Sequence, residues 1–297
     1  MGPGAGAGMR VGAAILAVLL GFLALTGTTE ANAATATLPS QFRDGLIFVT
    51  AAIGAGPPGT FLLDTGAATT VLDARFAEAA KVKLGDATHI VGGGGAAQAR
   101  QAENVALTLA GEPPLLTDPV VADLGGPARM MGVRLDGILG DDVLRRFVVT
   151  LDYRDRAVRL SDAETAPADA VAMRLIATPF VQAVVEQGDR RPAAAFQIDT
   201  GANTAVAFWA PFAAQALDSE AVRPGYGVGV GGLTRRAFGR VDALDVAGRR
   251  IVAPKADFAD QVRPDDAGPD YGGVIGGPAW TGLVLTLDFP RRRVWVR

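Results

Sequence analysis

The chain has 297 residues, of which 49% are hydrophobic and 20% charged, with 38 glycines and a net charge of −3. This composition is typical of a folded, loop-rich globular protein, and the charge excludes the basic field needed to bind nucleic acid. There is no cysteine and one histidine, His89, so thiol nucleophiles, disulfides, zinc clusters and Ser-His-Asp triads have little or nothing to use. Any hydrolytic chemistry must come from carboxylates, and we expect no metal and no cofactor.

The first 33 residues have the pattern of an export signal. Arg10 supplies a positive charge, Val11 to Leu25 form an apolar run, and Ala31-Asn32-Ala33 is the small-residue pattern that signal peptidase reads. The run is shorter than the ~20 apolar residues of a spanning helix, and no later stretch is suited to span a bilayer. We therefore expect residues 1–33 to be a signal peptide and the mature protein to be periplasmic or secreted. An uncleaved N-terminal membrane anchor is the alternative.

The rest of the chain carries one pattern twice. Phe61-Leu62-Leu63-Asp64-Thr65-Gly66-Ala67 returns as Phe196-Gln197-Ile198-Asp199-Thr200-Gly201-Ala202. A hydrophobic pair followed by glycine comes later in each half and ends at Gly140 and at Gly276. Asp64 and Gly140 are 76 residues apart, and Asp199 and Gly276 are 77 apart. A register shared over this length indicates an internal duplication.

Each half is predicted to be mostly β. Apolar and β-branched stretches bounded by Gly and Pro favour two β-hairpins in each half, one near its start and one at its end. A short helix is expected after each Asp-Thr-Gly-Ala stretch, with Asp73 as a candidate N-cap of the first. The predicted hairpins cover 47–63, 148–160, 180–198 and 284–296, and the predicted helices cover 73–82 and 210–217.

The two halves are predicted to form two lobes. Residues 161–172 are rich in Ala, Asp and Pro and are expected to link them. We expect an N-terminal lobe at 34–165 and a C-terminal lobe at 166–297. If the lobes face each other about a pseudo-twofold axis, Asp64 and Asp199 occupy equivalent places and meet at the interface.

Two carboxylates at one interface have a defined chemistry. When they lie ~3 Å apart they do not readily both ionise, so the pair keeps one proton above the pH where a free Asp loses it. The pair is then a general base and a general acid at once and can activate a water molecule. In the same picture Thr65 and Thr200 hydrogen-bond across the interface, while Gly66 and Gly201 let the backbone pass close to a carboxylate. Because both acids are on one chain, catalysis would not require a dimer.

The paired motifs resemble the pepsin/retropepsin superfamily of aspartic peptidases, and more specifically a bacterial member of the retroviral type with both lobes in one chain. Asp-Thr-Gly-Ala in both halves and the second hydrophobic-hydrophobic-Gly motif carry the resemblance, which covers roughly residues 45–297. It implies a mostly β, bilobal acid-protease-like fold, with two pseudo-twofold-related β lobes, short helices and an active-site cleft between them. It also implies an aspartic endopeptidase in which Asp64 and Asp199 activate water and a peptide or protein substrate lies extended across the cleft.

The resemblance further implies Gly-rich flaps that cover the bound peptide. Two glycine-rich stretches lie 28 and 30 residues after the two aspartates, counted to Gly92 and Gly229. Glycine supplies the freedom that a closing lid needs, although two flexible hairpin turns are the plainer interpretation. Asn203 stands where retroviral enzymes often carry an acidic residue that holds the substrate backbone, and Ala68 is its counterpart. The predicted flap residues are Gly92, Gly93, Gly94, Gly95, Gly229, Gly231 and Gly232.

Two other classes of function stay open. A catalytically inactive peptide-binding or scaffolding protein would retain the same fold, although loss of an Asp usually marks that fate and both are intact here. A β-rich structural protein of the cell envelope would use the Asp-Thr-Gly loops only as turns, and the matched spacing argues against it. The natural substrate, the preferred side chains and any activation step are not readable from the sequence.

Other acidic residues are distinguished from the pair by the duplication. Asp136, Asp141 and Asp142 have no acidic match in the second half. Asp152 and Asp288 do match each other, but each is followed by arginines, and solvated ion pairs are their expected role. None of these residues is predicted to form a second pair.

Overall fold

The computed structural model describes Met1 and residues 35–110, 112–216, 222–259 and 270–297. The predicted signal peptide, apart from Met1, lies outside the described residues. Within those ranges no helix combines the length and the apolar character needed to cross a membrane. Ala33–Arg297 is one unit by its internal contacts.

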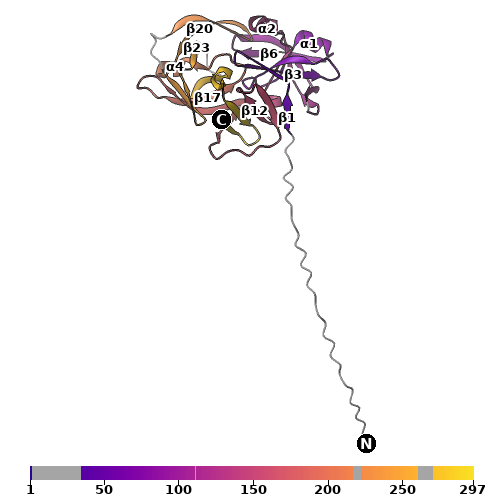
Figure 1. The fold of residues 1–297 in the computed structure, drawn as a ribbon. Helices are drawn as coiled ribbons and strands as arrows, with labels where there is room; N and C mark the ends of the chain where they lie inside the picture. The colour runs from indigo at the N-terminus through magenta and orange to yellow at the C-terminus, as the bar shows by residue number, and fades with distance from the viewer. Residues whose placement is uncertain (2–34, 111, 217–221, 260–269) are drawn as a thin grey trace. The chain divides into compact units, whose positions relative to one another are not determined.

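The first half folds into a ten-stranded sheet (Figure 1). The strand order is β6-β7-β10-β5-β11-β4-β3-β8-β9, and β2 pairs with β3 outside this path. At the centre β4 runs parallel to β11, and β5 runs antiparallel to β11. The bounds are β2 Ser40–Arg43, β3 Leu46–Ile53, β4 Gly59–Leu63, β5 Val71–Asp73, β6 Leu84–Gly92, β7 Gly95–Ala102, β8 Val105–Leu109, β9 Leu115–Thr117, β10 Val120–Ala122 and β11 Gly137–Leu139.

The second half repeats this topology in another ten-stranded sheet. Its order is β19-β20-β23-β18-β24-β17-β16-β21-β22, with β15 paired to β16. Here β17 runs parallel to β24 and β18 antiparallel to it, as β4 and β5 do with β11. The bilobal, mostly β fold that the duplication predicted is therefore confirmed. The bounds are β15 Arg174–Ile176, β16 Thr178–Glu186, β17 Ala193–Asp199, β18 Val206–Trp209, β19 Arg223–Gly229, β20 Gly232–Arg240, β21 Ala243–Val246, β22 Arg249–Val252, β23 Lys255–Ala259 and β24 Tyr271–Gly276.

A third sheet joins the two halves. Its order is β1-β13-β12-β25-β26-β14, so the first three strands come from the first half and the last three from the second. The central strands β12 and β25 are antiparallel, and Thr150 stands opposite Thr286 with 3.2 Å between their hydroxyl oxygens. The predicted linker contributes β14 to this sheet. The bounds are β1 Thr35–Leu38, β12 Val148–Asp152, β13 Ala157–Ser161, β14 Val171–Ala172, β25 Val284–Asp288 and β26 Arg293–Val296.

Short helices follow each active-site loop, as the sequence predicted. Helix α1 begins after Asp73, whose carboxylate accepts a hydrogen bond from the Arg75 N–H at 3.2 Å and so caps the helix. Three further short helices were not predicted. The bounds are α1 Ala74–Ala79, α2 Gly125–Met131, α3 Asp141–Leu144, α4 Ala210–Ala216 and the 3₁₀ helix η2 Gly277–Trp280.

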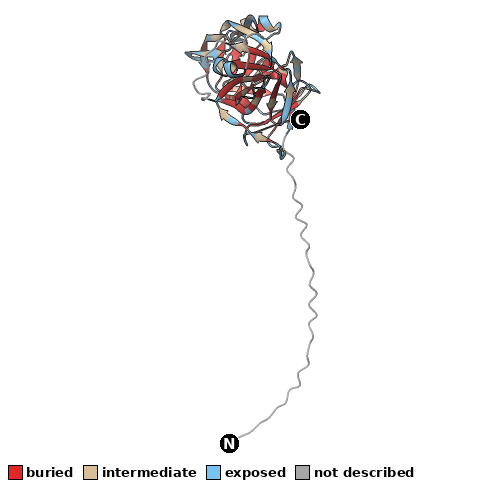
Figure 2. Cartoon of the chain, turned by 90° about the vertical axis from the view of Figure 1, so that its left-hand side faces the viewer, coloured by how far each residue is buried: buried red, intermediate tan, exposed pale blue. Residues whose placement is uncertain are grey.

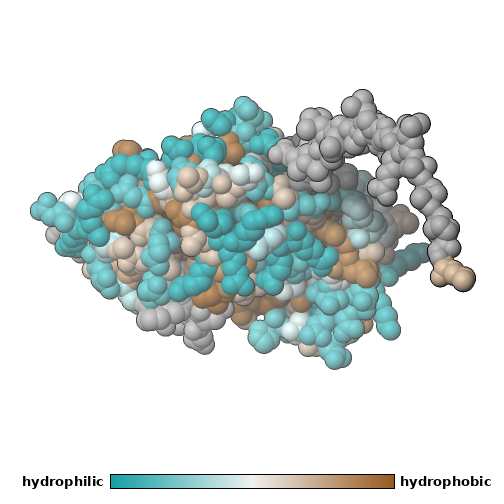
Figure 3. All heavy atoms as spheres, turned by 90° about the horizontal axis from the view of Figure 1, so that it is seen from below, coloured by the Kyte–Doolittle hydropathy of each residue, from teal (hydrophilic) through white to brown (hydrophobic). Residues whose placement is uncertain are grey.

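The interior is built from the apolar strands. Buried residues are concentrated in the strands of the sheets (Figure 2), and one hydrophobic cluster includes residues of both halves, among them Phe61, Phe196 and Trp280. The face of the molecule drawn in Figure 3 is mainly hydrophilic, and hydrophobic residues lie among the hydrophilic ones. Burial of this continuous apolar core is the main favourable term that holds the two lobes as one unit.

The expectation of solvated ion pairs at Asp152 and Asp288 is wrong about their exposure to solvent, although Asp288 does pair with Arg291 at 3.4 Å. Both residues are buried at the ends of β12 and β25. The Asp152 carboxylate accepts backbone N–H bonds from Arg154 and Asp155 at 3.0 and 2.9 Å, and that of Asp288 accepts one from Arg291 at 3.0 Å. These buried acids close the hairpin turns by accepting bonds from the backbone N–H groups of the turn residues.

Candidate active site

The two Asp-Thr-Gly-Ala loops begin where central strands end. Asp64 follows β4, Asp199 is the last residue of β17, and both strands are buried along most of their length. The Asp64 N–H donates to the Leu139 carbonyl at 3.0 Å, so the first loop is tied to β11. A Cβ on Gly140 would lie 2.6–2.8 Å from the backbone of Thr69 and Thr70, so only glycine fits beneath this loop. The hydrophobic-hydrophobic-Gly motif thus supports the loop by close packing.

The two loops are tied together by their threonines. The Thr65 N–H donates to Thr200 Oγ1 at 3.1 Å, and the Thr200 N–H donates to Thr65 Oγ1 at 3.1 Å. Each hydroxyl then donates across the interface, Thr65 to the Ile198 carbonyl and Thr200 to the Leu63 carbonyl, both at 2.7 Å. Both side chains are fully buried, so these four reciprocal bonds fix the loops against each other in a low-dielectric environment.

The glycines bring each loop against the carboxylate of the other. A Cβ on Gly66 would lie within 2.7 Å of both Asp199 carboxylate oxygens, and a Cβ on Gly201 would lie 2.7 Å from Asp64 Oδ1. No side chain fits at either position. Asp64 and Asp199 consequently lie within hydrogen-bonding reach of each other, and both keep part of their surface accessible to solvent.

The surroundings make the two acids unequal. Burial raises the pKa of Asp199 well above its ordinary value, and the neighbouring charge and hydrogen bond of Asp64 raise it further. Burial also raises the pKa of Asp64, but the hydrogen bonds from Asp199 and from backbone N–H groups oppose that rise. Asp64 Oδ1 accepts from the N–H groups of Gly66 and Ala67 at 2.8 and 3.1 Å. Asp199 Oδ1 accepts one such bond, from the Gly201 N–H at 2.9 Å, so the geometry favours Asp64 as the anion of the pair.

The predicted loop residues are thus brought together at one place, and the predicted flap glycines at another. Thr65 bonds to Thr200, Gly66 lies against Asp199, and Gly201 lies against Asp64. Ala67 and Ala202 complete the two loops. Asn203 is exposed just beyond the second loop, and Ala68 is exposed beyond the first. Their contact with a substrate stays a prediction.

The predicted flap stretches form two hairpins whose turns touch. Strands β6 and β7 close at the Gly92–Gly95 pair, and β19 and β20 close at the Gly229–Gly232 pair. Across the two turns the Gly94 N–H donates to the Val230 carbonyl at 2.8 Å. A Cβ on Gly94 would lie 2.7 Å from the Gly229 carbonyl oxygen, and one on Gly231 would lie 2.6 Å from the Gly95 nitrogen. Glycine is required here because the two backbones approach directly.

Two polar residues near the loops were missed by the sequence reasoning. Gln197 Nε2 donates to the Gly66 carbonyl at 3.2 Å, which links the second lobe to the first loop. Arg236 on β20 forms a nearly buried ion pair with Asp257 at 2.7 Å behind the second hairpin. The mismatch between Leu62 and Gln197 in the aligned repeats was a signal for the first, whereas nothing in the sequence marked the second.

The unmatched acids have structural partners. Asp142 accepts hydrogen bonds from the Thr70 N–H and hydroxyl, both at 2.8 Å. Asp141 is buried and pairs with Arg145 at 2.9 Å, and burial raises its pKa to about 6. Within the described ranges no group of three or more potential ligands is arranged to hold a metal ion.

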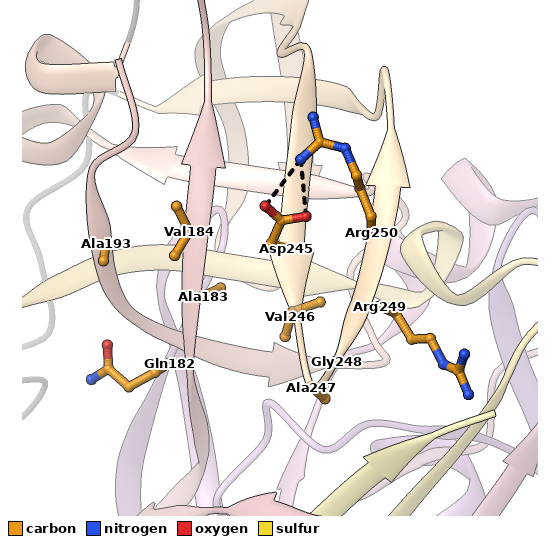
Figure 4. A pocket seen from close by; sticks show the side chains of 10 residues that line it. All are labelled: Gln182, Ala183, Val184, Ala193, Asp245, Val246, Ala247, Gly248, Arg249 and Arg250. Atoms are coloured by element: carbon orange, nitrogen blue, oxygen red, sulfur yellow. Dashed lines mark hydrogen bonds and ion pairs between the residues drawn. The ribbon is translucent and has the colours of Figure 1, made fainter. Parts of the chain in front are cut away.

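A separate hollow of about 390 Å³ lies on the second lobe between β16 and the β21–β22 hairpin (Figure 4). Its acidic residue, Asp245, already pairs with Arg250 at 3.1 Å and with Arg191 at 2.9 Å. Arg249 donates from Nε to the Val296 carbonyl at 2.9 Å. No residue of the two Asp-Thr-Gly-Ala loops lines this hollow, and its charges are satisfied within the protein, so it is not a candidate reaction site.

Comparison with known proteins identifies the first half of the chain. Residues 49–143 match the model of a family described as "Aspartyl protease". The matched range runs from β3 into α3 and contains the first Asp-Thr-Gly-Ala loop and the Gly92–Gly95 turn. The loop of Asp199 lies outside it. A search of curated proteins gave no match.

The reciprocal threonine bonds predict a stability effect. Thr65→Val keeps the side-chain volume but leaves the Thr200 N–H and the Ile198 carbonyl unpaired and buried, so we expect the free energy of unfolding to fall by about 2–4 kcal/mol. Thr37→Val on the exposed face of β1 is the matched control and should change it by less than about 0.5 kcal/mol. Urea unfolding measures both. Equal effects of the two variants would contradict the assigned role of the threonines.

The raised pKa of Asp199 predicts a pH-dependent effect on stability. A carboxyl group with a raised pKa in the folded state favours folding at pH values below its unfolded pKa, and this contribution is lost as the pH rises through the folded pKa. Asp199→Asn removes the cost of the buried charge, so the variant should be more stable than wild type by about 1–3 kcal/mol at pH 7. The difference should shrink at pH 4. Urea unfolding at both pH values tests it, with the exposed Asp189→Asn as control; a difference independent of pH would disprove the shift.

Proposed function

We propose that this chain, a member of the aspartyl protease family, is an aspartic endopeptidase in which Asp64 and Asp199 activate water to hydrolyse a peptide bond. The observation that carries the proposal is the reciprocal contact of Gly66 with the Asp199 carboxyl and of Gly201 with the Asp64 carboxyl. Two acids held together in this way share one proton. One carboxylate can then act as a base while the other, protonated carboxyl acts as an acid.

The two acids take different roles. Asp64, stabilised as the anion by its backbone N–H bonds, accepts a proton from a water molecule whose oxygen attacks the scissile carbonyl carbon. Asp199 gives its proton to the carbonyl oxygen, so that a neutral gem-diol forms. The C–N bond then breaks as the proton held by Asp64 passes to the leaving nitrogen and a gem-diol hydroxyl returns a proton to Asp199. Atoms and charges balance, and no further reactant is needed.

The substrate would be a peptide or protein segment lying between the Asp-Thr-Gly-Ala loops and the two hairpin turns. The turns touch each other in this structure, so a bound peptide requires them to separate and close again. The glycines at 92–95, 229, 231 and 232 are suited to that motion, and we propose that the exposed Asn203 contacts the peptide backbone. One chain is sufficient for the reaction because it supplies both acids.

Loss of either carboxyl should abolish peptide hydrolysis. We expect Asp64→Asn and Asp199→Asn each to lower kcat/KM by roughly 10²–10⁴-fold or more, since each removes one half of the acid–base pair. Asp189→Asn, which changes an exposed turn, should keep full activity. Cleavage of a peptide mixture, followed by mass spectrometry, measures this, and circular dichroism establishes that the variants are folded. Cleavage by both variants at the wild-type rate would contradict the mechanism, whereas peptide binding without cleavage by wild type and by both variants would favour a scaffolding protein instead.

The rate should also depend on pH in a defined way. Activity should rise as Asp64 ionises and fall again as Asp199, whose pKa is raised, loses its proton, so that a bell-shaped profile has its maximum in the acidic range. Both limbs belong to the pair and not to one residue. The profile of kcat/KM between pH 3 and pH 9 is the measurement; a rate that climbs steadily to pH 9 would contradict the mechanism.

We further propose that the protein is exported. The charged start, the apolar run and Ala31-Asn32-Ala33 support removal of residues 1–33 in a periplasmic or secreted product. N-terminal sequencing of the protein from fractionated cells should find a chain that starts at Ala34. Full-length protein in the membrane fraction would instead support the N-terminal anchor.

A further inference from the structure

The two lobes carry chemically different side chains at equivalent places beside the paired acids. Leu62 and Gln197 each stand two residues before their aspartate, on β4 and β17. The residues paired with them on the adjacent strands are apolar in both lobes. Among these three positions, therefore, only the central one changes from an apolar to a polar side chain. The paired neighbours are Phe48 and Ile138 for Leu62, and Phe180 and Val274 for Gln197.

In the first lobe this place is apolar. Leu46, Leu62 and Leu135 are buried members of one hydrophobic cluster. Ala67 of the Asp-Thr-Gly-Ala loop packs against the same cluster, so it reaches the active site. Val230, from the turn of the second hairpin, packs against it as well.

In the second lobe the three leucines are replaced by a hydrogen-bonded group. Thr178 and Tyr271 stand where Leu46 and Leu135 stand in the first repeat, by their offsets from the paired strand positions. Gln197 Nε2 donates to Thr178 Oγ1 at 2.8 Å, and the Tyr271 hydroxyl donates to Gln197 Oε1 at 3.4 Å. These bonds orient the amide of a half-buried glutamine.

The same amide reaches the reaction centre. Its second N–H donates to the Gly66 carbonyl at 3.2 Å, and Gly66 is the glycine that lies against the Asp199 carboxyl. Gln197 is therefore a polar group fixed directly beside the paired acids. Its counterpart Leu62 makes no such bond because it has no polar side-chain atom.

The turns of the two hairpins also differ, since one carries an apolar side chain where the other has glycine. Alignment of the closing pairs, Gly92–Gly95 and Gly229–Gly232, sets Gly93 opposite Val230 in the repeats. Val230 covers the apolar cluster of the first lobe, whereas Gly93 has no side chain with which to cover the second. The apolar cover that Val230 gives the leucines therefore has no side-chain counterpart at Gly93.

From these differences we infer that Gln197 is a specificity-determining residue, and that the protein prefers peptides with an apolar side chain on one side of the scissile bond and an uncharged polar side chain on the other. This inference rests on the proposed peptidase function. The leucine cluster capped by Val230 accepts the apolar side chain. Both N–H groups of the Gln197 amide are bonded within the protein, to Thr178 and to Gly66. Its Oε1 has a second lone pair beside the bond from Tyr271 and accepts a hydrogen bond from an amide or hydroxyl of the substrate; an apolar group there would leave that lone pair unpaired.

The test compares cleavage preferences of the whole protein. A peptide library, with cleavage sites read by mass spectrometry, should give for wild type an apolar residue on one side of the cut and Gln, Asn, Ser or Thr on the other. Gln197→Met, which keeps the length of the side chain, should lower kcat/KM for such a peptide about 3- to 10-fold relative to a peptide with Leu at the polar position. Gln197→Glu should move the preference at that position toward Lys and Arg.

Gln182→Met is the matched control, since Gln182 is exposed on β16 and lies away from the loops. It should leave the cleavage pattern unchanged. If wild type cleaves peptides in a way that depends on Asp64, but both Gln197 variants give the same cleavage pattern as wild type, the inference is overturned and the peptidase function stands. No Asp64-dependent cleavage by wild type would overturn both.

Discussion

The reciprocal hydrogen bonds of Thr65 and Thr200 are the constraint on which the rest of the site depends. They join residues 135 positions apart in the chain, and each threonine contributes both a donor and an acceptor in a fully buried place. An N–H or carbonyl left unpaired there would carry the full cost of its desolvation. Only one relative position of the loops satisfies all four bonds, and in that position each glycine meets the opposite carboxyl. The closeness of two acids that repel as anions thus results from bonds that neither acid makes.

The same geometry explains why two aspartates in repeated loops are not equivalent. Both lie in surroundings that oppose ionisation, so only one negative charge is tolerated. Small differences in the backbone donors around the two groups then decide where that charge resides. Asp64 Oδ1 accepts two N–H bonds, at 2.8 and 3.1 Å, and Asp199 Oδ1 accepts one, at 2.9 Å, which favours the charge on Asp64. A division into base and acid therefore needs no difference in residue type. It follows from how the two lobes, similar but not identical, close around one shared proton.

Much of this arrangement was readable from the sequence because duplication gives each motif an internal reference. Asp64 with Asp199, the two threonines, the glycine turns and the central hairpins all occur in register. Helix α1 was predictable from its cap, Asp73. Features without a local signal were missed: helices α2 and α3 are too short to show a period, and the pairing of β12 with β25 depends on contacts over more than a hundred residues.

Burial of polar groups was the other source of error. Asp152 and Asp288 stand beside arginines in the sequence, which suggested exposed ion pairs, but their nearest unsatisfied donors are the N–H groups of the turn. A carboxylate that caps a turn can be buried because backbone donors replace water. Gln197 was overlooked for the opposite reason, since a glutamine among apolar residues was weighed only as part of a strand. Its partners, Thr178, Tyr271 and Gly66, come from three other segments of the chain.

Comparison of the two repeats separates residues that hold the structure together from residues that would select the substrate. The repeats carry the same residue at two contacts that join the lobes: Thr65 with Thr200, and Thr150 with Thr286 at the centre of the joining sheet. They differ beside the axis, where Leu62 faces Gln197 in the alignment and Val230 faces Gly93. In a homodimer every substitution appears on both sides of the axis, so one wall cannot change alone. A single chain removes that restriction, because each lobe has its own codons while the shared sheet holds the axis in place. Divergence of one wall toward polar contacts, with the threonine bonds kept, is what selection for an unsymmetrical peptide would produce.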